Sequence, residues 1–226
     1  MLSPESSSHI FIVTTNELLS ATTPEAALPV EEHPLSPFTP PGMKLIVLGS
    51  FPPGRNRWCM EFFYPNYTND MWRIFGLCFF DDKLKFVDER RKTFHKEAIE
   101  KFLTSKKIGL YDAATAVIRT KNTASDKDLL IVRPTDIPQM LRHHPQCKAI
   151  VTTGQKSTEL VCECFGIGMP AMGSFTTFHF DDRTIKLYRM PSSSRAYPLS
   201  PIKKAQYYSK MFQHEGILPL GIPYKK

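Results

Sequence analysis

Gly49-Ser50-Phe51-Pro52 follows the apolar run "KLIVL" and leads into a basic turn that contains Arg55. Glycine lets a ligand approach the backbone closely, and proline fixes the shape of a loop. We interpret this stretch as a strand that delivers a rigid loop to the edge of a sheet. A tight turn without a ligand is the simpler explanation of the stretch taken alone.

A second stretch, "EFFYPNYTNDMWRIFG" at 61–76, combines aromatic side chains with two amides. Phe63 and Tyr64 could stack on a planar base, and Asn66 or Asn69 could hydrogen-bond to its edge. The alternative is a core cluster followed by an asparagine that caps a helix.

A third stretch, "MPSSSRAYPLSPIKKA" at 190–205, is a strand end, a polar loop and the start of a helix. Hydroxyl groups, backbone amides and a helix N-terminus are the usual partners of phosphate. The alternative is a flexible polar loop. The candidate phosphate contacts are Ser192, Ser193, Ser194, Arg195, Lys203 and Lys204.

The surrounding pattern alternates strands with helices. Apolar runs predict strands at 43–50, 108–114, 147–154 and 184–194. Amphipathic or capped segments predict helices at 69–80, 90–107, 135–145, 155–165 and 200–212. This order predicts a three-layer α/β/α sandwich with a central, mostly parallel four-stranded sheet.

In such sheets ligands bind beyond the carboxyl ends of the strands. The loops 49–58, 112–116 and 191–200 should meet there, together with Asp112. Asp112 could polarise a water molecule, or it could accept backbone hydrogen bonds in the turn.

The chain of 226 residues fits a single large domain. Residues 1–43 are rich in proline, serine and threonine, and we expect an extended arm packed on the domain, with one strand-like run, "HIFIV". Residues 44–226 should form a single α/β domain.

The composition favours a polyanion partner. The net charge is +7 and the pI is near 9.1, which suits DNA or RNA because neutralised phosphates release counterions. Ordinary solubility charge explains the same value. The five cysteines include no C-x-x-C pair, so we expect reduced thiols and no metal site. No membrane span and no signal peptide are expected, which predicts a cytoplasmic protein, or a nuclear one.

Taken together and in this order, the stretches resemble the uracil-DNA glycosylase superfamily, nearest to its mismatch-specific and hypoxanthine branches. Those proteins begin with a strand and a G-x-x-P loop, continue with an aromatic segment ending in Asn-x-x-(aromatic), and end with a strand, a Pro-Ser loop and a helix. Here these motifs are 49–52, 61–72 and 190–195, and "IGLYDAA" and "AIVTTGQKS" are similar to the second and third strands. The resemblance covers about residues 30–215.

The resemblance implies a DNA glycosylase of base excision repair. It would flip out a deaminated base, uracil or hypoxanthine, and hydrolyse its N-glycosidic bond. It implies a monomer that acts on double- or single-stranded DNA without a metal or organic cofactor. The implied base pocket consists of Gly49, Ser50, Phe51, Pro52, Phe63 and Tyr64. The implied DNA contacts are Arg55, Ser192, Ser193, Ser194, Arg195, Lys203 and Lys204.

Two departures from the family pattern bear on catalysis. Many members carry asparagine where this chain has Phe51, and histidine where it has Met190. The hypoxanthine branch lacks both and is thought to use an asparagine of the aromatic segment, which corresponds to Asn69, with Asn66 as a rival. The alternatives are a binding module on the same fold that does not cleave DNA, and a nucleoside hydrolase.

Overall fold

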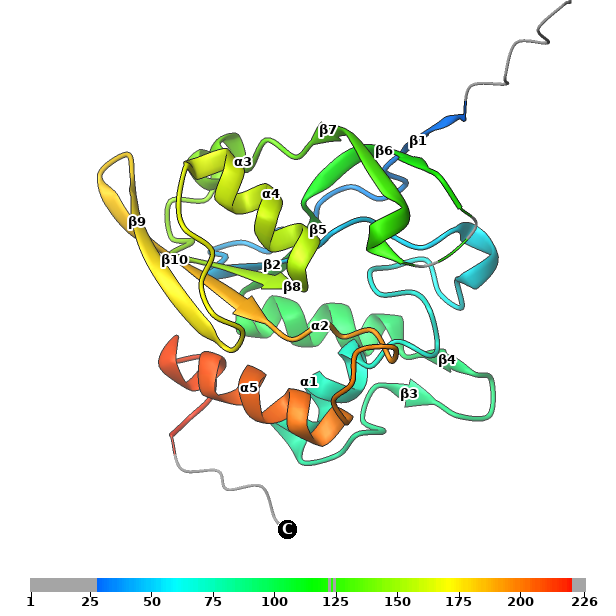
Figure 1. The fold of residues 1–226 in the computed structure, drawn as a ribbon. Coiled ribbons are helices and arrows are strands. Elements are labelled where there is room, and N and C mark those ends of the chain that lie inside the picture. Colours follow the sequence, from blue (N-terminus) through cyan, green and yellow to red (C-terminus); the bar gives the residue numbers. More distant parts are fainter. Residues whose placement is uncertain (1–27, 122, 124, 221–226) are drawn as a thin grey trace, which may run out of the picture.

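A five-stranded sheet forms the centre of the molecule (Figure 1). The structure is a computed structural model that describes residues 28–121, 123 and 125–220. The strands lie in the order β5 (Ile108–Asp112), β2 (Leu45–Gly49), β8 (Ala149–Thr153), β10 (Arg183–Met190) and β9 (Ser174–Phe180). The first four are parallel, and every residue of β2, β5 and β8 is buried, as is typical of strands covered on both faces.

The mostly parallel sheet is confirmed, but the predicted number of four strands is wrong. The fifth strand, β9, runs antiparallel to β10 at the edge of the sheet. Its Phe178 and Phe180 are buried and pack on Phe165, whereas Phe175 is 40% exposed. An edge strand that is only half-buried lacks the continuous apolar run that marks the central strands.

Helices cover both faces of this sheet and complete three layers (Figure 1). One layer contains α1 (Met71–Phe80), α2 (Lys96–Lys106) and α5 (Pro201–His214), and the other contains α3 (Ile137–His143) and α4 (Gln155–Phe165). The predicted helix ends are confirmed at α5 and α4. Ser200 Oγ accepts a hydrogen bond from the Lys203 amide, and Gly166 ends α4 in the left-handed conformation.

Two helices differ from the prediction in detail. The helix expected at 90–107 begins only at Lys96, because a short hairpin of β3 (Val87–Asp88) and β4 (Thr93–Phe94) precedes it. Phe94 therefore contributes to the core from a strand, and Ala98 is exposed. In α5, Ile202 is 55% exposed, whereas Ala205, Tyr208 and Phe212 are buried.

A second, antiparallel sheet lies beside β5 and was not expected (Figure 1). Its order is β1 (Val30–Glu32), β6 (Ala114–Arg119) and β7 (Leu129–Pro134). The short helix η2 (Asp126–Asp128) precedes β7. After β1 the chain runs back along β5, where Phe38 pairs with Leu110. The strand-like run at 9–13 lies outside the described residues.

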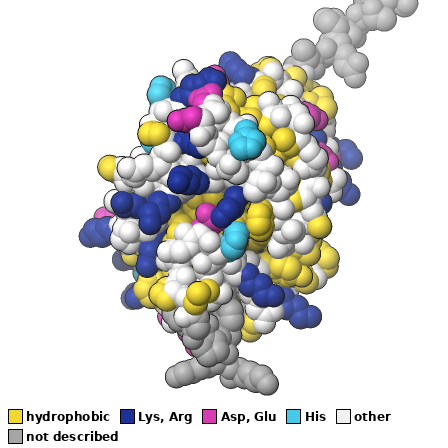
Figure 2. Space-filling model, turned by 90° about the vertical axis from the view of Figure 1, so that its left-hand side faces the viewer, with side chains coloured by type: hydrophobic (Ala, Val, Ile, Leu, Met, Phe, Trp, Pro, Cys, Tyr) yellow, Lys and Arg dark blue, Asp and Glu magenta, His cyan; other side chains and the backbone are white. Residues whose placement is uncertain are grey.

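Positive charge is also present away from the predicted binding edge. Figure 2 shows Lys and Arg side chains scattered over the side of the molecule that carries β9, away from the carboxyl ends of the parallel strands. Net charge therefore does not by itself mark a binding face. None of the five cysteines, all of which lie in the described residues, forms a disulfide. Among the described residues, no helix has the length and apolar character needed to cross a membrane.

Candidate active site

The carboxyl ends of the parallel strands bring the sequence motifs together. Gly49 ends β2 and pairs with Asp112, the last residue of β5. A Cβ atom at Gly49 would lie 2.2 Å from Asp112 Oδ1. Only glycine therefore allows this carboxylate to lie against the first motif; the close approach here is made by a side chain of the protein and not by a ligand.

Asp112 has one engaged and one available carboxylate oxygen. Its side chain is 10% exposed, and Oδ2 lies 2.9 Å from His33 Nε2. Within the described part of the chain, no group forms a hydrogen bond with Oδ1. The sequence allowed that Asp112 accepts hydrogen bonds from backbone amides of the turn, but its partner in the structure is His33. Oδ1 is left as an acceptor for a water molecule or a ligand.

The loop after Gly49 is anchored by residues that sequence reasoning missed. Ser50 is buried, and its Oγ donates to Asp126 Oδ2 at 2.8 Å. Burial raises the pKa of Asp126, and the neighbouring Asp112 carboxylate raises it further. Arg119 Nη2 donates to the Pro52 carbonyl at 3.0 Å and pairs with Glu31. The second sheet therefore holds the first motif in place.

The aromatic residues of the predicted base pocket differ in accessibility. Phe63 is 3% exposed and belongs to the main core, so its prediction as a base-stacking residue is corrected: its ring has no free face. Phe51 is 9% exposed and packs with Ala114, Val117 and Leu129, so little of its ring is available to a base.

Tyr64 is the half-buried member of the set. Its hydroxyl group lies 3.2 Å from Thr153 Oγ1 at the end of β8, and it lies 3.6 Å from the position of a Cβ at Gly49. Burial raises the pKa of Tyr64, so the hydroxyl group keeps its proton. It can act as a hydrogen-bond donor at the same edge as Asp112.

Both candidate asparagines cap turns at the start of α1. Asn69 Oδ1 accepts from the Met71 amide at 2.9 Å, and Asn66 Oδ1 accepts from the Thr68 amide at 3.0 Å and from its hydroxyl group at 2.9 Å. The N-cap of α1 is Asp70, whose side chain makes no capping hydrogen bond, so Asn69 does not cap the helix as considered but forms a side-chain turn just before it. The two side-chain NH₂ groups make no hydrogen bond with the described residues, so they are available as donors to a ligand.

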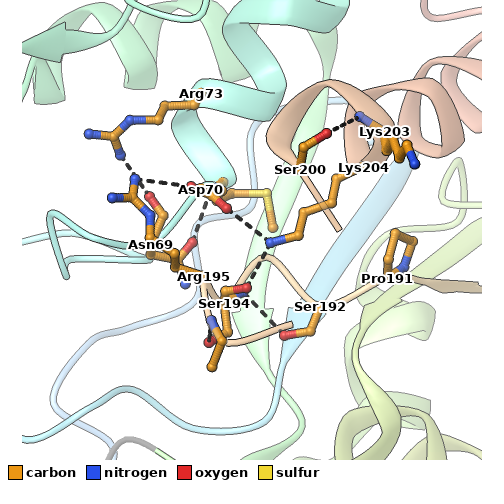
Figure 3. A network of polar contacts seen from close by, with 12 residues as sticks. Asn69, Asp70, Arg73, Pro191, Ser192, Ser194, Arg195, Ser200, Lys203 and Lys204 are labelled. Atoms are coloured by element: carbon orange, nitrogen blue, oxygen red, sulfur yellow. Dashed lines mark hydrogen bonds and ion pairs between the residues drawn. The ribbon is translucent and has the colours of Figure 1, made fainter. Parts of the chain in front are cut away.

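A buried ion pair fixes the third motif against α1 (Figure 3). Asp70 Oδ2 lies 2.9 Å from Lys204 Nζ, and these side chains are 2% and 0% exposed. Lys204 Nζ also donates to the Ser194 carbonyl at 2.7 Å, and the Asp70 amide donates to the Ser193 carbonyl at 2.9 Å. Asp70, the N-cap residue of α1, is thus the centre of a clamp on the loop.

This clamp corrects two of the predicted DNA contacts. Lys204 is completely buried and engaged, so its ammonium group is not available to a phosphate. Ser193 is 3% exposed and faces inward.

Other predicted contacts lie at the surface. Ser194, Lys203 and Arg55 are exposed, and Arg195 is 57% exposed while it contacts Asp70 at 3.3 Å. Ser192 is half-buried beside Gly154, the residue before α4. Arg55 already pairs with Glu61 and stacks on Trp58.

The site thus combines a carboxylate with one free oxygen, a buried tyrosine hydroxyl group and a fixed polar loop. Such an arrangement can orient water beside a planar ligand and hold an anionic backbone at its rim. No group of three or more His, Cys, Asp or Glu side chains in the described residues could hold a metal ion. His33 and Asp126 come from the arm and from the β6–β7 connection, and no local motif in the sequence pointed to them.

Comparison with known proteins finds a solved structure of similar fold. No protein-family model and no curated protein matches the chain. Among solved structures it is similar to the solution NMR structure of a "putative Uracil DNA glycosylase from Methanosarcina acetivorans", with a TM-score of 0.55 and 18% sequence identity. The match covers 83% of this chain and 99% of that one. The mixed α/β fold described above is therefore shared with that protein.

Proposed function

We propose that this chain is a DNA glycosylase that flips out a deaminated base, uracil or hypoxanthine, and hydrolyses its N-glycosidic bond. One observation carries the proposal. The free Oδ1 of Asp112 lies against the glycine of the first motif, at the sheet edge where Tyr64 and the clamped serine loop also meet. The fold shared with the archaeal protein supports the same reaction class.

The proposed pocket reads one edge of the base. The backbone of Gly49 to Phe51 faces this edge, and the Tyr64 hydroxyl group, which lies beside Gly49, is a further donor to it. Stacking of the base on the half-buried Tyr64 ring would contribute about 1–3 kcal/mol. A mispaired or deaminated base is less costly to extrude from the duplex, which adds selectivity.

The chemical step needs a proton acceptor and stabilisation of separated charge. As the bond breaks, its electron pair leaves with the base, and the sugar becomes oxocarbenium-like. In the proposal, water adds to the sugar carbon and gives its proton to Asp112 Oδ1. A carboxylate is a better acceptor than a neutral amide, so Asn69 acts instead by donating from its NH₂ group to the base or the DNA backbone. Asn66 is the alternative donor.

The proposed DNA contacts lie around the serine loop. Ser192, Ser194 and Arg195 would contact phosphates, with Lys203 and Arg55 farther out on the rim. Arg195 could also enter the space that the flipped base leaves. Arg195 is itself 57% exposed, and Asp70 keeps Lys204 as its buried partner, so Arg195 could leave Asp70 at little cost.

A module that binds DNA without cleaving it is the second candidate, and Phe51 favours it. This residue stands where many glycosylases carry a catalytic asparagine, and here the position lies in an apolar cluster. A nucleoside hydrolase is the third, and it would not require the phosphate contacts at the rim.

A single-turnover assay distinguishes these candidates. Duplex oligonucleotides that contain uracil, hypoxanthine, xanthine or a thymine mismatch are incubated with excess protein, and hot alkali reveals abasic sites. We expect cleavage of a uracil or hypoxanthine substrate that is lost in Asn69→Ala or Asn66→Ala. Cleavage unaffected by both substitutions would refute their role. Tight, salt-sensitive binding without cleavage would favour the binding module. If the protein neither cleaves nor binds the duplexes, the nucleoside hydrolase is favoured and is tested with free nucleosides.

A further inference from the structure

We infer that His33 is a positioning residue for Asp112, so that the N-terminal arm supplies part of the active site. His33 follows β1 directly, and its amide donates to the Thr115 carbonyl at 2.8 Å. Its side chain is 2% exposed, with Nε2 at 2.9 Å from Asp112 Oδ2. The inference rests on the proposed function, because it assigns a role within that site.

The imidazole ring is fixed by aromatic neighbours. Its centroid lies 4.7 Å from that of Tyr111, 5.4 Å from that of Phe51 and 6.3 Å from that of Phe63. The two phenylalanines were predicted to contact a base. They instead pack on the histidine, so they support the carboxylate indirectly.

Both ring nitrogens lie beside acceptor oxygens. Nδ1 lies 2.8 Å from the Leu35 carbonyl oxygen and 3.2 Å from the Leu35 amide nitrogen. A ring with a proton on each nitrogen donates to the Leu35 carbonyl group and to Asp112 Oδ2. In a neutral ring one of these oxygens faces a lone pair; a proton on Nε2 then satisfies the charged carboxylate and leaves Nδ1 to accept from the Leu35 amide.

The two carboxylate oxygens of Asp112 therefore have different roles. The histidine holds Oδ2 and thereby fixes the plane of the carboxylate. Oδ1, beside Gly49, remains the acceptor for water. His33 touches neither water nor base in this scheme, so its loss should slow the chemical step without weakening DNA binding.

The test compares His33→Ala with His33→Gln, whose amide can still donate to Oδ2. Single-turnover rates are measured on the substrate that the wild type cleaves, with His143→Ala, an exposed histidine of α3, as the control. We expect His33→Ala to lower the rate by about 10- to 100-fold, the range typical of groups that orient a reacting residue. DNA affinity should be unchanged, and His33→Gln should recover most of the rate. An unaffected rate in His33→Ala, or equal losses in both folded variants, would overturn the inference.

A second readout does not depend on activity. Long-range ¹H–¹⁵N spectra of histidine-labelled protein should show His33 with a proton on Nε2, and Asp112→Ala should shift this signal while leaving His143 unchanged. An unprotonated Nε2, or a His33 signal insensitive to Asp112→Ala, would overturn the inference. If the wild type cleaves no substrate while the spectra show the pair, the proposed function fails and the catalytic role of His33 fails with it, but the pair itself is established.

Discussion

The clamp between Asp70 and Lys204 gives a quantitative test of how the serine loop is held. Lys204→Met keeps the length of the side chain but removes the ammonium group. Asp70 is then left as a buried carboxylate whose remaining cation, Arg195, is largely exposed. Removing one partner of a buried ion pair typically costs about 3–5 kcal/mol, because the other charge stays uncompensated.

The neighbouring lysine provides a matched control. Lys203 belongs to the same helix but is exposed, so Lys203→Met should change the free energy of unfolding by no more than about 0.5 kcal/mol. Urea unfolding at neutral pH, extrapolated linearly to water, measures these values.

A double-mutant cycle tests whether the cost comes from the pair. Asp70→Asn alone should also cost about 3–5 kcal/mol, since it leaves a buried ammonium group. The double variant should cost clearly less than the sum of the two single variants. Additive losses, or a loss in Lys204→Met as small as that in Lys203→Met, would refute the clamp.

Three further results are expected. Gly49→Ala should abolish most of the base-release rate, because its Cβ would displace the Asp112 carboxylate, whereas Gly168→Ala meets open space and should leave the rate unchanged. Asp126→Asn should gain stability relative to the wild type as the pH rises. The raised pKa of Asp126 means that its contribution to stability is present below its ordinary pKa of 3.8 and is lost on ionisation. A difference between the free energies of unfolding of Asp126→Asn and the wild type that does not change with pH would contradict this. Arg195→Ala should flatten the salt dependence of duplex binding by about 0.9 in log–log slope, the value for one phosphate contact.

The sequence was most informative where burial is continuous. The runs in β2, β5 and β8 are covered on both faces, and each was predicted within a few residues. The caps at Ser200 and Gly166 were equally clear, because the backbone there requires particular residue types. The edge strand β9 and the sheet of β1, β6 and β7 are only half-buried, so their alternation is weak against the background of loops.

The site itself was only partly predictable. The meeting of Gly49 and Asp112 followed from parallel strands that end at one edge. The pairing of His33 with Asp112 depends on how the arm folds back, and no spacing rule encodes a contact across 79 residues. Lys204 was predicted to contact a phosphate, because a lysine in the first turn of a helix is usually exposed. It is instead buried by its ion pair with Asp70, a contact that the sequence did not indicate.

The identity of the released product tests the central claim most directly. A duplex with a single uracil or hypoxanthine is incubated with the wild type and with Asp112→Asn, and both the small molecules and the strand are analysed by mass spectrometry. We expect a free base and an intact abasic strand from the wild type, and little of either from Asp112→Asn. No free base from any substrate, or equal release by the two proteins, would contradict it.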